Sequence, residues 1–141
     1  MQLFSHDDKA HALGKTPLFA NLSRSDLVTL ARVTEDLEVE AGKVLAREGD
    51  IGHEFFVIVD GEVEITRDGT AVRTLSSGDF FGEIALIWDS PRRTATATAV
   101  TPLRFFVLTR QAFRALIDNH PDIEQKVLEA LEERVPETGG A

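Results

Sequence analysis

Apolar and polar residues follow two different periods along this chain, a helical one towards both ends and a strand-like one between them. Between residues 23 and 34, apolar residues recur at helical spacing. Ser23, with Asp26 three residues later, resembles a capping box at the start of that segment. We therefore predict a helix over residues 23–34, preceded by a shorter helix over residues 5–13 that ends at Gly14.

The middle of the chain, residues 37–108, has the pattern of short strands separated by glycines. Within the pieces, β-branched and aromatic residues alternate with polar ones, and Asp60-Gly61 and Asp68-Gly69 are hairpin signals between them. Short strands with turns at this spacing predict a β-sandwich or barrel. The clearest strands are expected at Phe55–Val59, Glu62–Thr66, Ala71–Leu75, Thr94–Val100 and Leu103–Leu108.

Two helices are predicted after the strands. Thr109 can cap the first of them, and Pro121 suits the first turn of the second, which Pro136 should stop. The chain then divides into an N-terminal helical segment (1–36), the strands (37–108), the C-terminal helices (109–135) and a disordered tail (136–141).

The composition narrows the classes of partner. A formal net charge of −9 repels nucleic acid and anionic lipid, and the only cluster of basic residues is the pair Arg92-Arg93. The chain has no cysteine, and no apolar run approaches the roughly 18 residues of a membrane span. Residues 1–12 carry His6, Asp7, Asp8 and Lys9 where a signal peptide would need an apolar core. We expect a cytoplasmic protein that has no membrane span and binds no nucleic acid.

The segment from residue 80 to residue 94 carries the candidate chemistry. Gly82 is followed by Glu83 to Trp88, which can form a short helix whose free N–H groups suit a phosphate. Beyond a Ser-Pro turn, the arginine pair and Thr94 add a planar guanidinium and a hydroxyl donor. A carboxylate such as Glu83 accepts hydrogen bonds from sugar hydroxyls. The segment therefore suits a ligand that combines an anion with a ribose.

Three ordered motifs resemble the cyclic-nucleotide-binding domain family. Its phosphate-binding cassette is matched by Phe81-Gly82-Glu83-Ile84-Ala85-Leu86, followed by Pro91-Arg92-Arg93-Thr94-Ala95-Thr96. Upstream, Ala41-Gly42-Lys43-Val44-Leu45 and Glu48-Gly49-Asp50-Ile51-Gly52 are similar too, as is Phe55-Phe56-Val57-Ile58 leading to Gly61-Glu62-Val63. The resemblance implies a mainly β fold with flanking helices: a double-stranded β-helix, or jelly-roll-like barrel, with N-terminal helices and two C-terminal helices.

The resemblance also implies roles for single residues. Glu83, with Gly82, would bind the ribose, while an arginine and Thr94 would bind the phosphate together with the backbone of Ile84 and Ala85. The spacing from Glu83 admits either Arg92 or Arg93 as the phosphate arginine. The run Thr94-Ala95-Thr96 matches the family only if that arginine is Arg93, so Arg93 is preferred and Arg92 is the alternative.

The implied ligand is cAMP or cGMP, and the implied output is movement of the C-terminal helices towards an effector protein or domain that the sequence does not identify. The stripe Val127, Leu128 and Leu131 would then cover the base. No catalytic residue, cofactor or metal site is expected, because the four histidines are dispersed and form no His-x-His pair. The alternative is a degenerate barrel of the same family that acts as a ligand-free protein interaction module.

Overall fold

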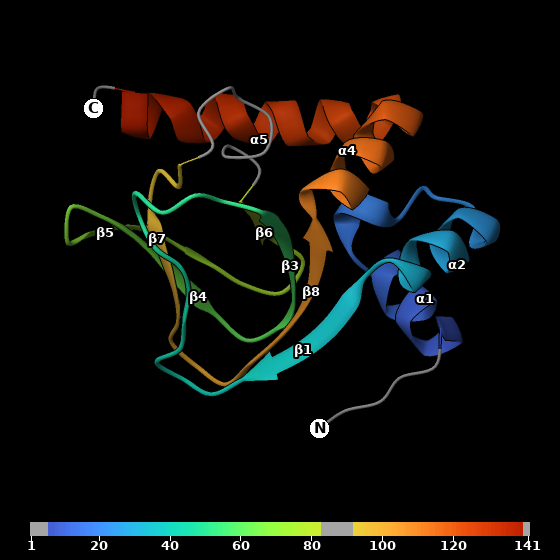
Figure 1. Ribbon diagram of the computed structural model, residues 1–141, viewed down its shortest axis with the longest axis horizontal. Helices are drawn as coiled ribbons and strands as arrows, with labels where there is room; N and C mark the ends of the chain where they lie inside the picture. Colours follow the sequence, from blue (N-terminus) through green and yellow to red (C-terminus); the bar gives the residue numbers. More distant parts are fainter. Residues whose placement is uncertain (1–5, 83–91, 140–141) are drawn as a thin grey trace.

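Two four-stranded antiparallel sheets face each other at the centre of the computed structural model, which describes residues 6–82 and 92–139 (Figure 1). The first sheet has the order β1-β8-β3-β6, formed by Glu35–Val39, Leu103–Thr109, Glu54–Asp60 and Phe80–Phe81. The second has the order β2-β7-β4-β5, formed by Val44–Ala46, Thr96–Ala99, Val63–Arg67 and Thr70–Leu75. The predicted mainly β fold with flanking helices is confirmed.

Alternation along β7 shows how the sequence builds the space between the sheets. Ala97 and Ala99 are buried, whereas Thr96 and Thr98 on the opposite face are partly exposed. The small alanine side chains allow the larger residues of the other strands to fill this core. The core consists of Phe56, Ile58, Val63, Leu75, Phe81, Ala97, Ala99, Leu103, Phe105 and Val107.

One of the two predicted hairpins is present. β4 and β5 pair antiparallel with Arg67 opposite Thr70, so Asp68 and Gly69 form a two-residue turn. Both turn residues have positive φ, 52° and 80°, as the favoured hairpin turn requires.

The hairpin predicted at Asp60-Gly61 is wrong, because β3 and β4 belong to different sheets. Glu62 instead bonds to the segment that joins β7 to β8: its N–H donates to Thr101 Oγ1 at 3.0 Å, and its carbonyl accepts from Val100 N at 3.0 Å. The connection from β3 to β4 and the connection from β7 to β8 therefore run side by side from one sheet to the other. Gly61 permits this, since a Cβ there would lie 2.5 Å from the Pro102 carbonyl oxygen.

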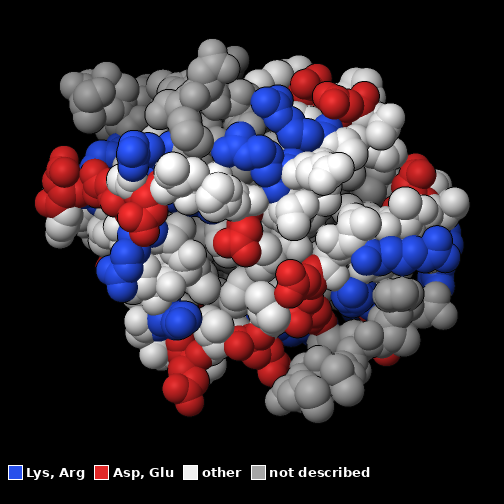
Figure 2. All heavy atoms as spheres, viewed as in Figure 1, with Lys and Arg blue, Asp and Glu red and all other residues white. Residues whose placement is uncertain are grey.

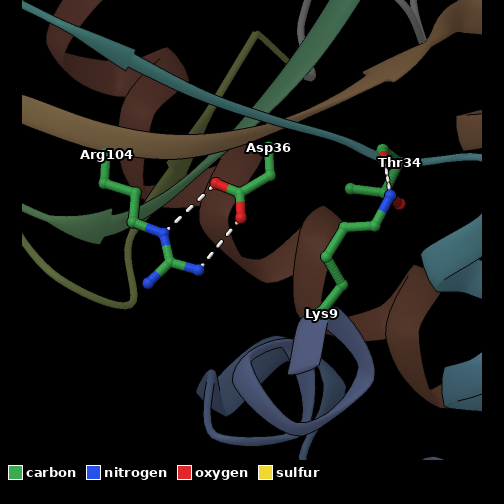
Figure 3. Close-up of polar contacts among 4 residues, drawn as sticks. All are labelled: Lys9, Thr34, Asp36 and Arg104. Carbon is green, nitrogen blue, oxygen red and sulfur yellow. Dashed lines mark hydrogen bonds and ion pairs between the residues drawn. The ribbon is translucent and has the colours of Figure 1, made fainter. Parts of the chain in front are cut away.

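The N-terminal helices pack beside the first sheet (Figure 1). They are α1 at His6–Gly14, the short 3-10 helix η1 at Pro17–Phe19 and α2 at Arg24–Arg32. The predicted cap is confirmed, since Asp26 N donates to Ser23 Oγ at 3.0 Å. Polar contacts tie the helices to the barrel in Figure 3: Lys9 Nζ donates to the Thr34 carbonyl at 2.8 Å, next to the bidentate Arg104–Asp36 pair that joins β8 to β1.

Two C-terminal helices follow β8, α4 at Arg110–Asn119 and α5 at Pro121–Gly139, and α5 lies across one end of the barrel (Figure 1). Thr109 caps α4 as predicted, accepting from Ala112 N at 3.1 Å. The predicted stop at Pro136 is wrong, because α5 continues to Gly139. A proline removes one hydrogen bond, but its fixed φ is helical, so the backbone can continue through it. Residues 136–139 of the predicted tail are therefore helical, and 140–141 lie outside the described residues.

Charged side chains of both signs are interspersed over the face shown in Figure 2. A nucleic-acid surface needs a continuous basic patch, and the described residues visible on this face do not form one. Within residues 6–82 and 92–139, no helix has both the length and the apolar composition needed to cross a membrane.

Candidate anion-binding site

Arg93 is held in place by its own backbone. Its N–H donates to the Asp50 carbonyl at 2.7 Å, and its carbonyl accepts from Gly49 N at 2.9 Å. Both backbone groups of residue 93 therefore face the turn at residues 49–50. These two hydrogen bonds fix where the Arg93 side chain begins.

The guanidinium of Arg93 is buried, with 8% of the residue exposed. Nη2 donates to the Glu54 carbonyl at 2.9 Å and Nη1 to the Gly82 carbonyl at 3.3 Å, while the Phe56 ring lies under the guanidinium with its centroid 5.5 Å from Cζ. Both backbone carbonyls fix the orientation of the guanidinium plane. A buried, preoriented cation with a planar set of donors is suited to binding one small anion.

Gly82 is required by this arrangement on two counts. Its φ of +95° lies in the region that L side chains rarely adopt. A Cβ at this position would lie 2.8 Å from Arg93 Nη1 and 2.8 Å from the Glu54 carbonyl oxygen. The glycine that was predicted from the motif thus lets the chain approach Arg93 closely enough to accept its hydrogen bond.

Arg92 lies in different surroundings. It is exposed, its Nη1 donates to the Gly49 carbonyl at 2.7 Å, and its backbone forms an isolated bridge with Ile51. The exposed arginine holds a turn, whereas its neighbour is buried among carbonyl groups. This difference favours Arg93 over Arg92 as the anion-binding residue, in line with the preferred sequence register.

The structure describes only some of the other predicted site residues. Thr94 is partly buried, and its carbonyl accepts from Arg67 Nε at 2.8 Å. Glu83, Ile84 and Ala85, together with the short helix predicted over residues 83–88, lie outside the residues that the structure describes. Their assigned contacts with ribose and phosphate stay predictions.

A cavity of about 260 Å³ opens beside Arg93. It is lined by Val44, Leu45, Ala46, Arg47, Asp50, Ile51, His53, Glu54 and Arg93. Of these lining residues, only Arg93 was predicted from the sequence to bind the ligand. The Glu48-Gly49-Asp50-Ile51-Gly52 motif carries the family resemblance, but no ligand contact was predicted for its residues. The contacts of Asp50 and Glu54 pass through backbone carbonyls, which any residue type supplies, so residue identity gives no signal for them.

The stripe predicted to cover a base is split by the structure. Val127 is fully buried in the core beneath the helices, in the same cluster as Phe113 and Ile123. Leu128, by contrast, is 38% exposed. The Leu131 side chain lies outside what the structure describes. In this structure Val127 packs in the core, and Leu128 is the one residue of the stripe whose described side chain is exposed.

Comparison with known proteins places the chain in a family. The family model "Cyclic nucleotide-binding domain" matches residues 36–120, more than half of the chain, and the chain belongs to this family. The matched region is a regulatory domain that is not itself catalytic.

Relatives of several kinds share this domain. The chain is 40% identical over 106 residues to a cAMP-dependent protein kinase regulatory subunit from Eremothecium gossypii, covering 74% of this chain and 23% of that protein. It is 35% identical over 118 residues to a cyclic nucleotide-gated potassium channel from Rhizobium etli, covering 84% of this chain and 33% of that protein. The chain thus spans less than two thirds of these relatives.

Among solved structures, the regulatory domain of Toxoplasma gondii protein kinase A, crystallised with cAMP, is 32% identical with a TM-score of 0.67. The match covers 78% of this chain and 43% of that one. The arrangement of two sheets with helices on either side is therefore that of the family.

Proposed function

We propose that this chain is a cyclic-nucleotide sensor and that cAMP is its ligand, with cGMP as the alternative. The observation that carries the proposal is the buried Arg93 guanidinium, which two backbone carbonyls orient beside a cavity in a family member. The two protein kinase relatives described above have cAMP in their names, which supports cAMP as the first ligand to test. Other relatives are named cGMP-dependent protein kinases, which keeps cGMP as the alternative.

In the proposed complex, Arg93 donates to an exocyclic oxygen of the cyclic phosphate. Thr94 and the backbone of Ile84 and Ala85 complete the anion site, and Glu83, with Gly82, accepts from the ribose hydroxyl. A preoriented guanidinium contributes more than a mobile one, because little ordering remains to be done when the anion arrives. It also offsets the repulsion that a protein of net charge −9 exerts on an anion.

The output of the sensor is a population shift of α5. A ligand shifts an equilibrium only by its differential affinity for the two states. A base seated on the barrel would offer an apolar surface to Leu128 and Leu131 on α5, and the conformation in which α5 covers the base would gain that contact. An effector protein or domain that contacts α5 would respond to this shift.

Calorimetric titration of the protein with cAMP, cGMP and 5′-AMP tests the proposal. We expect one cyclic nucleotide per chain and weaker binding of 5′-AMP, whose phosphate carries more charge and is not tied back to the ribose. A melting curve should show about 2.7 kcal/mol of stabilisation at a hundredfold excess over Kd. If neither cyclic nucleotide binds, the ligand-free interaction module becomes the better description.

The ribose contact predicts a selective loss. Glu83→Ala should weaken cAMP by roughly tenfold or more, because a hydrogen bond to a charged acceptor contributes about 1.5–3 kcal/mol. The same substitution should hardly change the affinity of 2′-deoxy-cAMP, which lacks the hydroxyl. Glu35→Ala, which removes an exposed carboxylate from β1, is the matched control. Equal losses for the two nucleotides would show that Glu83 does not bind the 2′-hydroxyl.

A further inference from the structure

His53 lies in the wall of the cavity that opens beside Arg93. The residue is exposed, and it lines the same space of about 260 Å³ as the buried arginine. It directly precedes Glu54, the first residue of β3, whose carbonyl accepts from Arg93 Nη2 at 2.9 Å. The imidazole therefore belongs to the short segment that orients the candidate anion-binding residue.

Hydrogen bonds hold this segment, the turn at residues 49–54, from two sides. On one side, both backbone groups of Arg93 bond to the turn. On the other side, α4 contributes two bonds: Arg110 N donates to the His53 carbonyl at 2.9 Å, and Arg110 Nη2 donates to the Gly52 carbonyl at 2.9 Å. Because its backbone is fixed between these two elements, the His53 side chain starts from a fixed point at the cavity wall.

The charge that a ligand meets in this cavity depends on the state of His53. The charged side chains around the turn come from several elements: Arg47 after β2, Asp50 in the turn, Glu54 in β3, Arg92 and Arg93 before β7, and Arg110 in α4. Among the described residues that line the cavity, the two arginines are matched by the two carboxylates. Histidine is the side chain whose charge ordinarily changes between about pH 5 and 8. A neutral His53 leaves this lining without net charge, and a protonated His53 makes it positive.

We propose that His53 is a second cation of the anion-binding site, protonated when the nucleotide is bound, and that the chain binds a cyclic nucleotide more tightly as the pH falls. The inference rests on the proposed function and names a further residue of the same site. A nearby opposite charge favours the charged form of an ionisable group, so the phosphate promotes protonation of His53. By reciprocity, protonation of His53 promotes binding of the phosphate by the same factor.

Titration calorimetry with cAMP between about pH 5.5 and 8 tests this contribution. The cyclic phosphodiester keeps its single negative charge over this range, so a change in affinity comes from the protein. Because His53 is exposed and its charge is screened, we expect cAMP affinity to be at least about threefold higher at the acidic end than at the alkaline end, and less so at high salt. Binding in the middle of the range should take up protons, which titrations in buffers of different ionisation enthalpy measure.

His53→Gln removes the titrating group and keeps a polar side chain. Its cAMP affinity should be independent of pH, close to the affinity of the unchanged protein at the alkaline end, and its binding should take up no protons. His11→Gln, which removes an exposed histidine from α1, is the matched control. This variant should keep both the pH dependence and the proton uptake of the unchanged protein.

Each alternative outcome has a distinct meaning. If the unchanged protein binds cAMP with one affinity across the range, or if His53→Gln keeps the pH dependence, the proposal is overturned. It is overturned as well if His53→Gln lowers affinity by the same factor at every pH, because His53 would then act through its shape and not through its charge. If His53→Gln unfolds, the same comparison is made with His53→Asn. Absence of binding at every pH would overturn the proposed function itself, whereas binding that is independent of pH overturns only the role of His53.

Discussion

Arg93→Ala is expected to weaken cAMP binding by roughly 10- to 100-fold or more, whereas Arg92→Ala should cost less than about fivefold. The buried Arg93 guanidinium is preoriented by the Glu54 and Gly82 carbonyls, so each hydrogen bond that it gives to an anion is charge-assisted and poorly screened. Arg92 is an exposed charge with a single bond to the Gly49 carbonyl. Titration calorimetry of both variants measures the difference.

Arg93→Lys separates charge from geometry at this position. A lysine keeps the positive charge but cannot reach the Glu54 carbonyl and the ligand with one fork of donors. We expect an affinity between those of the unchanged protein and Arg93→Ala. Equal losses for Arg92→Ala and Arg93→Ala would disprove the assignment of the phosphate arginine, even if the protein binds cAMP.

Gly82→Ala should both destabilise the fold and weaken nucleotide binding. Any alanine at a left-handed φ costs about 1–2 kcal/mol. At Gly82 the added methyl group would also lie 2.8 Å from Arg93 Nη1 and from the Glu54 carbonyl oxygen, and such overpacking costs roughly a further 1–3 kcal/mol. We expect thermal unfolding well below that of the unchanged protein and at least tenfold weaker cAMP binding, since Arg93 must move.

Gly69→Ala provides the matched control. Gly69 also has a positive φ, 80°, but a Cβ there would have no neighbour within 4 Å. The control therefore bears the backbone cost alone, and its cAMP affinity should be unchanged. If Gly82→Ala and Gly69→Ala lower stability equally and both keep full affinity for cAMP, the close approach of Gly82 to Arg93 does not contribute to nucleotide binding.

Local signals in the sequence predicted the parts of the fold that depend on local chemistry. Ser23 and Thr109 cap their helices through hydroxyl oxygens, and the Asp68-Gly69 turn has the backbone angles that those residue types allow. The strand expected at Thr94–Val100 contains β7, in which buried alanines alternate with partly exposed threonines. In each case a few neighbouring residues determine the structure, so a short pattern is sufficient.

The errors arose where distant segments decide the structure. Asp60-Gly61 has the residues of a hairpin turn, but bonds to residues 100 and 101 send the chain to the other sheet. Pro136 was predicted to stop the last helix, but the helical φ of proline lets α5 continue to Gly139. The tandem arginines are identical as residue types. Only their tertiary surroundings, a buried pocket for Arg93 and an exposed turn for Arg92, distinguish them.

The contact between η1 and α5 has a consequence for how this domain can be joined to others. Lys126 Nζ donates to the Pro17 carbonyl at 2.9 Å, and Ile123 and Val127 share a core cluster with Leu18 and Phe19. Residues before the barrel and residues after it therefore form one packed unit, and a displacement of α5 disturbs both. If α5 moves as we propose, an effector fused upstream of the domain would be coupled to that movement, as would one fused downstream.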